Sequence, residues 1–122
     1  MKHLSLNSDH YTLSNRDQVQ ILTVADLLNE FTNQEILAAV EAKIAAGFTN
    51  FVIDLKPMAF MNSIGLNFLI AVRARTQESG GDVAVANPSE KIKQLLEVTK
   101  LQDVFNIATN VEDAMTYFLG SS

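Results

Sequence analysis

A strongly apolar segment, Phe51 to Leu55, lies near the middle of the chain, and a short loop and a longer apolar segment follow it. The first segment is typical of a strand buried on both faces, because its apolar residues do not alternate strictly with polar ones. The second, from about Ile64 to Ser79, has the length of a helix and ends at Gly80 and Gly81. A strand, a loop and a helix in this order predict a crossover between parallel strands.

The N-terminal half contains further segments with strand and helix patterns. Val19 to Val24 has the pattern of a strand. The sequence Thr32-Asn33-Gln34-Glu35 is a capping box, which predicts the start of a helix that Gly47 ends. Before them, apolar and polar residues alternate in a pattern that indicates a hairpin or two edge strands, with the apolar positions Leu4, Leu6, Tyr11 and Leu13.

The C-terminal half continues the alternation. Val83 to Ala86 and Val104 to Ala108 have strand patterns. Asn87-Pro88-Ser89-Glu90 predicts a helix with an N-cap followed by proline, and a box at Thr109-Asn110-Val111-Glu112 predicts the last helix. The alternation predicts an α/β fold with a mostly parallel mixed sheet of about five strands and about four helices.

The composition fits one ordinary domain. With 122 residues, of which 48% are hydrophobic, residues 1–122 are expected to form a single domain with one core. The absence of cysteine excludes disulfides and thiolate chemistry and favours a reducing compartment. No apolar run has the length of a membrane span and the N-terminus has no signal-peptide core, so a cytoplasmic protein without membrane insertion is expected.

Charge and residue types argue against several functions. The net charge is −5 and the nine Lys and Arg residues are scattered, so nucleic acid is not an expected partner. His3 and His10 have no cysteine or carboxylate at a ligand-like spacing, so no metal site is expected. There is no Gly-rich phosphate loop, nucleophile elbow or Cys-His arrangement, so we expect neither catalytic residues nor a cofactor, and the chain is not predicted to be an enzyme.

Ser63 lies where the predicted loop meets the predicted helix. Its hydroxyl oxygen can cap the helix, which is a common structural role. The same position can carry a phosphate, because a helix N-terminus favours negative charge. The helix is expected to have a core stripe formed by Leu66, Leu69, Ile70 and Val72. Ile64 and Phe68 lie beyond this stripe, and they either pack against a neighbouring helix or form an apolar rim around Ser63 that a partner buries.

The segment around Ser63 resembles the signature of the STAS domain, the fold of anti-sigma factor antagonists. That signature is an apolar strand ending in Asp-Leu, then Asp-Ser, a small residue and Gly-Leu before an apolar helix. It stands here as Asp54-Leu55 followed by Asn62-Ser63-Ile64-Gly65-Leu66. The resemblance covers nearly the whole chain and implies a STAS-type α/β sandwich; it continues through Gly80-Gly81-Asp82-Val83, Asn87-Pro88-Ser89, Leu95-Leu96, Leu101-Gln102-Asp103-Val104-Phe105 and Glu112-Asp113-Ala114.

The resemblance also implies a function. An anti-sigma factor antagonist binds a serine kinase that sequesters a sigma factor, and phosphorylation by that kinase ends the interaction. The implied phosphorylation site is Ser63, and a phosphatase is a second implied partner. The residues expected to contact the kinase are Asn62, Ser63, Ile64, Gly65 and Phe68.

Two departures from the signature leave an alternative open. Asn62 stands where the family usually has aspartate, and Ile64 stands where it usually has a small residue. Some STAS domains serve as scaffolds or transporter-regulatory subunits without phosphorylation. The sequence is compatible with that role, in which Ser63 is only a cap.

A third interpretation comes from Asp54, because an apolar strand ending in Asp-Leu also resembles the phosphoacceptor segment of response-regulator receiver domains. A receiver binds Mg²⁺ through an early acidic pair and uses a lysine followed by proline near its end. The early acidic residues here are the isolated Asp9 and Asp26, and Lys100 precedes Leu101. The receiver interpretation is therefore the weaker one.

Overall fold

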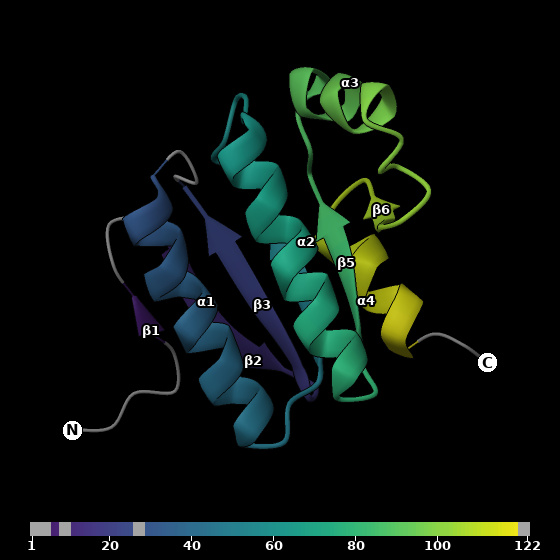
Figure 1. Ribbon diagram of the computed structural model, residues 1–122. Helices are drawn as coiled ribbons and strands as arrows, with labels where there is room; N and C mark the ends of the chain where they lie inside the picture. Colours follow the sequence, from purple (N-terminus) through teal and green to yellow (C-terminus); the bar gives the residue numbers. More distant parts are fainter. Residues whose placement is uncertain (1–5, 8–10, 26–28, 120–122) are drawn as a thin grey trace.

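The computed structural model describes residues 6–7, 11–25 and 29–119, which form a six-stranded mixed sheet flanked by helices (Figure 1). The strands follow one another across the sheet in chain order. β1, β2 and β3 pair antiparallel, whereas β3, β4, β5 and β6 pair parallel. The strands are Leu6–Asn7 (β1), Tyr11–Arg16 (β2), Val19–Val24 (β3), Asn50–Asp54 (β4), Asp82–Ala86 (β5) and Asn106–Ala108 (β6).

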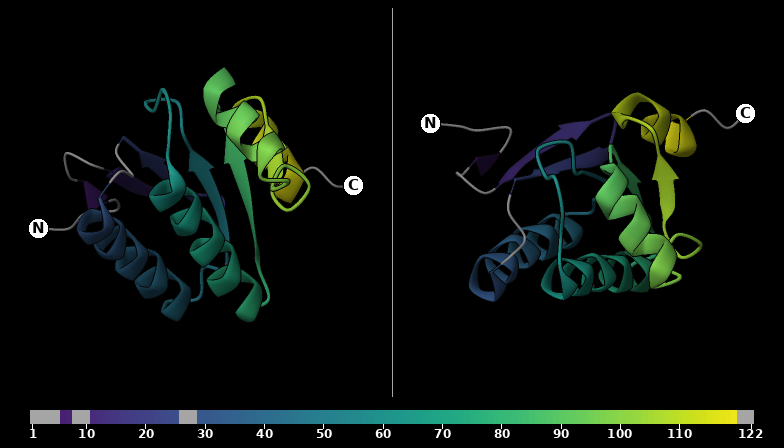
Figure 2. Two further views of the ribbon diagram at one scale, coloured as in Figure 1. Left: turned by 45° about the horizontal axis from the view of Figure 1, so that its top comes forward. Right: turned by 90° about the horizontal axis from the view of Figure 1, so that it is seen from above.

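Four helices occur in the described part of the chain, and they cover the two faces of the sheet unequally (Figure 2). α1, α2 and α3 contribute buried side chains to one hydrophobic cluster, and α4 contributes to a second cluster on the opposite face. The helices are Glu30–Ala45 (α1), Ser63–Glu78 (α2), Glu90–Val98 (α3) and Val111–Leu119 (α4). The predicted α/β class, the mixed sheet and the number of helices are confirmed.

The central strand β4 separates the two hydrophobic clusters. Its residues Phe51 and Ile53 belong to the larger cluster, which α1, α2 and α3 cover. Val52 belongs to the smaller cluster, together with Ala114 and Met115 of α4. All three strand residues are fully buried, because successive side chains of a strand point to opposite faces and both faces are covered. The prediction of a strand buried on both faces is confirmed.

The start of α1 lies earlier than the sequence pattern predicts. Its N-cap is Asn29, whose side-chain oxygen accepts hydrogen bonds from the backbone N–H groups of Phe31 and Thr32. Thr32 and Asn33 lie inside the helix and are each only 7% exposed. The predicted capping box at Thr32 is therefore wrong, because asparagine caps a helix as well as threonine does and Asn29 adds a turn to the helix.

Two later boundaries also differ from their predictions. α3 is capped by Ser89 rather than Asn87, because Asn87 has a φ of +58° and so lies in the left-handed region instead of the extended conformation of an N-cap. β6 begins at Asn106 rather than Val104. Val104 lies in a turn, in which its N–H donates a hydrogen bond to the carbonyl of Leu101. At the predicted box before α4, it is Asn110 that accepts a hydrogen bond from the N–H of Asp113.

A close backbone contact fixes the turn between α2 and β5. Gly80 has a φ of +89°, and a Cβ on the neighbouring Gly81 would overlap the carbonyl oxygen of Thr49. Only glycine fits at position 81, and the paired glycines end the helix as predicted. The predicted hairpin is present in β1 and β2, whereas Leu4, His3 and His10 lie outside the described residues.

Candidate functional site

The N-termini of α1, α2 and α3 all lie at one edge of the sheet, which faces the viewer in the right-hand panel of Figure 2. This follows from the parallel order of β3, β4 and β5, since each strand ends at that edge and a helix begins after it. Open α/β sheets characteristically place their functional groups at this edge. Ser63, the predicted phosphorylation site, is the first residue of α2 and belongs to this edge.

Asn62, not Ser63, caps α2. The side-chain oxygen of Asn62 accepts hydrogen bonds from the backbone N–H groups of Ile64, at 2.9 Å, and Gly65, at 3.3 Å. The structural role predicted for Ser63 is therefore wrong, because asparagine is an equally good cap and precedes the helix by one residue. Ser63 is exposed, and its hydroxyl makes no hydrogen bond to another described residue. The hydroxyl is thus available for chemistry without loss of the cap.

The electrostatics of the first turn also single out α2. The first turns of α1, α3 and α4 contain acidic side chains, which are favourable near the positive end of a helix dipole; they are Glu30, Glu90, and Glu112 with Asp113. The first turn of α2 contains none. Its N-terminus therefore has no negative charge of its own to complement the dipole.

The predicted contact residues divide into surface and core. Asn62 and Ser63 are exposed and Ile64 is half-buried, whereas Gly65 is buried and Phe68 is only 4% exposed. Phe68 packs in the larger cluster, so packing is the correct interpretation and an exposed rim at Phe68 is wrong. The helix buries Phe68 in this cluster, beside the groove between α1 and α2, which the apolar pattern alone cannot distinguish from an adjacent outward position.

Gly65 has a packing role that the sequence does not reveal. A Cβ at this position would lie 3.0 Å from the Cγ of Met61, in the loop before α2. This distance is shorter than an ordinary van der Waals contact, so a larger residue would displace Met61, which is 7% exposed and belongs to the core. Gly65 therefore allows the side chain of Met61 to pack closely against the first turn of α2.

Two exposed apolar residues near Ser63 were not predicted from the sequence. Phe60, in the loop before α2, is 53% exposed. Ile70 on α2 is 44% exposed, so its assignment to the core stripe of the helix is wrong. Ile70 lies seven residues after Ser63, so the two residues occupy the same face of the helix. The sequence signal that could have identified Phe60 is an aromatic residue within a short loop. The exposure of Ile70 has no such signal, because it depends on how α2 is rotated against the sheet.

A groove of about 270 Å³ separates the N-terminal halves of α1 and α2. Across it, the side-chain amide of Asn33 donates a hydrogen bond of 3.3 Å to the carbonyl of Ile64 in the first turn of α2. α1 is thus connected directly to the turn that carries Ser63. The residues that line the groove are Glu30, Asn33, Gln34, Leu37, Ile64, Asn67, Phe68 and Ala71.

Asp54, at the end of β4, has structural partners. Its carboxylate accepts hydrogen bonds of 3.0 Å from the N–H of Lys56 and from the side-chain amide of Asn87. The described residues contain no group of three or more His, Cys, Asp or Glu side chains that could hold a metal ion, and Asp9 and Asp26 lie outside them. The geometry thus gives the carboxylate of Asp54 a role in fixing the loops after β4 and β5.

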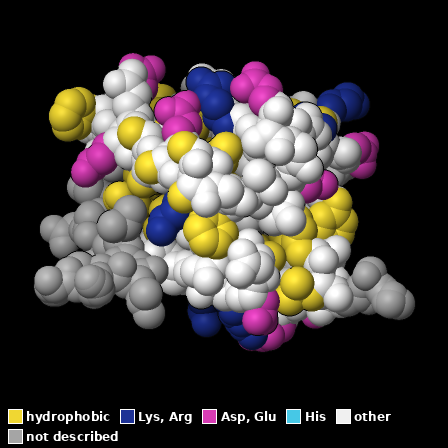
Figure 3. All heavy atoms as spheres, turned by 90° about the horizontal axis from the view of Figure 1, so that it is seen from below, with side chains coloured by type: hydrophobic (Ala, Val, Ile, Leu, Met, Phe, Trp, Pro, Cys, Tyr) yellow, Lys and Arg dark blue, Asp and Glu magenta, His cyan; other side chains and the backbone are white. Residues whose placement is uncertain are grey.

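The end of the molecule opposite to this edge has a mixed surface. There, acidic and basic side chains are interspersed among apolar and polar ones (Figure 3). None of the helices in the described ranges is long and apolar enough to span a membrane.

Comparison with known proteins agrees with this geometry. The family model of the STAS domain matches residues 10–114. The chain is 20% identical over 107 residues to BtrV of Bordetella bronchiseptica, a protein provisionally named an anti-sigma factor antagonist, and the match covers 88% of this chain and 92% of BtrV.

Solved structures share the fold at low sequence identity. The anti-sigma factor antagonist SpoIIAA in its unphosphorylated form superimposes with a TM-score of 0.77 at 18% identity, covering 92% of this chain and 98% of SpoIIAA. The phosphorylated form of Bacillus SpoIIAA gives 0.70 at 16% identity, covering 88% and 98%. The murine anion transporter Slc26a9 gives 0.73 at 14% identity, and the match covers 88% of this chain and 19% of the transporter. The match of the family model over residues 10–114 shows that this chain belongs to the STAS domain family.

Proposed function

We propose that the chain is a cytoplasmic, single-domain anti-sigma factor antagonist whose phosphorylation site is Ser63. In its unphosphorylated form it binds a serine-kinase anti-sigma factor, and phosphorylation of Ser63 by that kinase ends the interaction. The observation that carries the proposal is an exposed serine at the first position of α2, with the capping role taken by Asn62 and no acidic residue in the first turn. In this scheme the protein is a binder and a substrate, and the nucleotide and catalytic base belong to the kinase.

The site supports the proposal because the helix can accommodate a phosphate. Phosphorylation adds roughly −1.5 to −2 charges at neutral pH. Near the N-terminus of a helix, negative charge is stabilised by about 0.3–1 kcal/mol at an exposed site. Ser63 has no neighbouring acidic side chain in its helical turn that would repel the phosphate. The phosphorylated protein is therefore expected to remain folded.

The same charge is expected to disrupt binding. The exposed apolar residues nearest to Ser63 along the chain and along its helix are Phe60 and Ile70. A partner that buries these side chains together with Ser63 must also desolvate the phosphate, which costs several kcal/mol unless the partner supplies a cation. We therefore place the partner surface on Phe60, Asn62, Ser63, Ile64 and Ile70, with the buried Gly65 and Phe68 supporting it from below.

Asn62 does not remove the phosphoacceptor. The nucleophile is the hydroxyl of Ser63, and a kinase supplies the base that accepts its proton. Asn62 already makes the cap hydrogen bonds that an aspartate would make. We expect the replacement Asn62→Asp to change the rate of phosphorylation and not the ability to be phosphorylated.

The test begins with affinity capture of the partner from the native cytoplasm, and calorimetry then compares the wild type with Ser63→Asp and Ser63→Ala. We expect a serine kinase to be captured, a marked loss of affinity for Ser63→Asp and a much smaller loss for Ser63→Ala. The kinase, with ATP, should add one phosphate to Ser63 of the wild type, detected by mass and by site mapping. Equal affinities of the wild type and Ser63→Asp, or phosphate on Ser63 only after Asn62→Asp, would contradict the switch.

A second candidate function is a STAS scaffold or transporter-regulatory subunit. The observation in its favour is the structural similarity to part of the transporter Slc26a9. In that case, capture should recover a transport protein, and its affinity should be the same for the wild type and Ser63→Asp. The same capture experiment thus separates the two functions, and a phosphatase among the captured proteins would support the first.

A further inference from the structure

Ser89 uses one hydroxyl for two hydrogen bonds. Its oxygen accepts a bond of 3.2 Å from the N–H of Ile92, which caps α3. The hydroxyl also donates a bond of 2.6 Å to the carbonyl of Ala59, a residue 30 positions earlier in the chain. Ala59 lies in the loop that connects β4 to α2. The cap of one helix therefore holds the loop that precedes the neighbouring helix.

The loop has few other attachments. Its backbone is fixed near β4, where the N–H of Leu55 donates to the carbonyl of Ala86 and the N–H of Met58 donates to that of Leu55. The side chains of Met58 and Met61 are buried in the core, at 5% and 7% exposed. Nearer to β4, the carboxylate of Asp54 accepts from the backbone N–H of Lys56. Between Met58 and Met61, the bond from Ser89 is the one side-chain hydrogen bond that the described residues make to the loop backbone.

We propose that Ser89 is a positioning residue, which fixes the loop at Ala59 and thereby sets how Phe60 and Ser63 are presented to the partner. The inference rests on the proposed function for the identity of the partner. Phe60 follows Ala59 directly and is exposed, so a fixed carbonyl at Ala59 restricts the position of the aromatic side chain. A loop that is ordered before binding does not have to be ordered by the partner, which raises affinity.

Three substitutions separate this role from the capping of α3. Ser89→Asp retains a good capping oxygen, but an ionised carboxylate has no proton to donate to Ala59. Ser89→Gly removes the donor without adding charge, and glycine at an N-cap lowers helix stability by only a few tenths of a kcal/mol. Ser89→Thr retains both the acceptor and the donor. A matched control is Asn110→Asp, which adds the same charge at the N-terminus of α4, on the opposite face of the sheet.

The first measurement is the order of the loop, by ¹⁵N relaxation of the free protein. Rigid backbone has an order parameter of about 0.85 and flexible backbone one below about 0.6. We expect the value at Phe60 to fall toward the flexible range in Ser89→Asp and Ser89→Gly, and to remain at the wild-type value in Ser89→Thr and Asn110→Asp. Order parameters within α3 should not change in Ser89→Asp, because its cap is retained.

The second measurement is calorimetric affinity for the captured partner. With the loop ordered in about a tenth of the molecules, the dissociation constant rises about tenfold. We expect this loss for Ser89→Asp and Ser89→Gly, and recovery in Ser89→Thr. Unchanged order at Phe60 in Ser89→Asp and Ser89→Gly would overturn the role of Ser89 whatever the partner is, and so would a disordered loop with wild-type affinity. Capture of a partner other than a serine kinase would instead contradict the proposed function alone.

Discussion

α2 and α4 begin with the same kind of cap and differ in the charge of their first turns. Each has an asparagine before its first residue whose side-chain oxygen accepts backbone N–H groups, Asn62 for α2 and Asn110 for α4. α4 then has Glu112 and Asp113 in its first turn, whereas the first turn of α2 has no acidic residue. The caps therefore do not distinguish the N-termini of α2 and α4, and the difference between them is the negative charge in the first turn.

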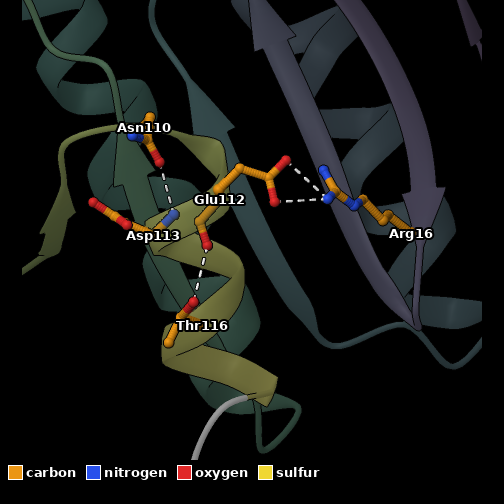
Figure 4. A network of polar contacts seen from close by, with 5 residues as sticks. All are labelled: Arg16, Asn110, Glu112, Asp113 and Thr116. Carbon is orange, nitrogen blue, oxygen red and sulfur yellow. Dashed lines mark hydrogen bonds and ion pairs between the residues drawn. The ribbon is translucent and has the colours of Figure 1, made fainter.

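The carboxylate of Glu112 in α4 is used within the fold. Glu112 accepts from Nη2 of Arg16 in β2 at 2.8 and 2.9 Å, and its backbone carbonyl accepts from the hydroxyl of Thr116 (Figure 4). Farther along α4, the hydroxyl of Tyr117 donates a hydrogen bond to the carboxylate of Asp82 in β5. This hydrogen bond raises the pKa of Tyr117, and the burial of its side chain raises it further. α4 thus complements its dipole with its own residues and is fixed to the sheet. The start of α2 has no acidic side chain, and Ser63 is exposed there, as the proposed phosphorylation requires.

The largest expected effect comes from the residues that hold each helix on the sheet. Phe68 of α2 is 4% exposed in the larger cluster, whereas Phe118 of α4 is only partly buried against the smaller one. We expect Phe68→Ala to lower the free energy of unfolding by about 3–5 kcal/mol, and Phe118→Ala by about half as much, because truncation of a buried aromatic leaves a cavity. Thermal and urea unfolding measure both. Equal losses would show that the two faces contribute alike.

The second prediction concerns the charge at the two helix starts. Ser63→Asp adds a carboxylate to the first turn of α2 and should stabilise the fold by about 0.3–1 kcal/mol, whereas Asp113→Asn removes one from α4 and should destabilise it by a similar amount. Both effects should shrink in high salt, which screens exposed charges. Urea unfolding at low and high ionic strength measures them. A fall in stability for Ser63→Asp at low salt would refute the claim that α2 tolerates a phosphate.

The smallest expected effect is the loss of the ion pair that fixes α4 to β2. The side chains of Arg16 and Glu112 are 43% and 71% exposed, so water screens their attraction. A double-mutant cycle with Arg16→Met and Glu112→Gln should give a coupling energy of about 0.2–1 kcal/mol. The pair Lys93–Glu90 on α3, at 3.3 Å and with exposures of 49% and 81%, is a control that should couple less. A coupling above this range would mean that the ion pair contributes more to the position of α4 than its exposure suggests.

Much of the fold could be predicted because its signals are local. The apolar run from Phe51 to Leu55 identified the central strand, and Gly47 and the Gly80-Gly81 pair identified where two helices end. The predicted helix starts were less accurate, at Thr32 for α1 and at Asn87 for α3. Several residues that can act as caps lie close together at each start, and the choice among them depends on backbone angles that the sequence does not specify.

The candidate site was only partly predictable. Ser63 was identified from its place between an apolar strand and a helix, and the resemblance to the STAS signature led to the proposal that it is phosphorylated. Which of its neighbours are exposed was not predictable, since Phe68 is buried whereas Phe60 and Ile70 are not. A helical pattern indicates that one face is apolar, but packing against α1 and the sheet decides how wide that face is.

By itself, the sequence determined the order of strands and helices, the buried strand β4 and the serine at the start of α2, because hydrophobic periodicity and caps act between residues close in the chain. The tertiary structure alone decided which groups hold that serine in place. Asn33 donates a hydrogen bond to the carbonyl of Ile64, which lies 31 residues later in the chain. Ser89 donates one to the carbonyl of Ala59, which lies 30 residues earlier. Such hydrogen bonds form only where the packing of helices brings a donor within about 3 Å of an acceptor. Local sequence patterns do not determine that distance, because the two residues are far apart in the chain.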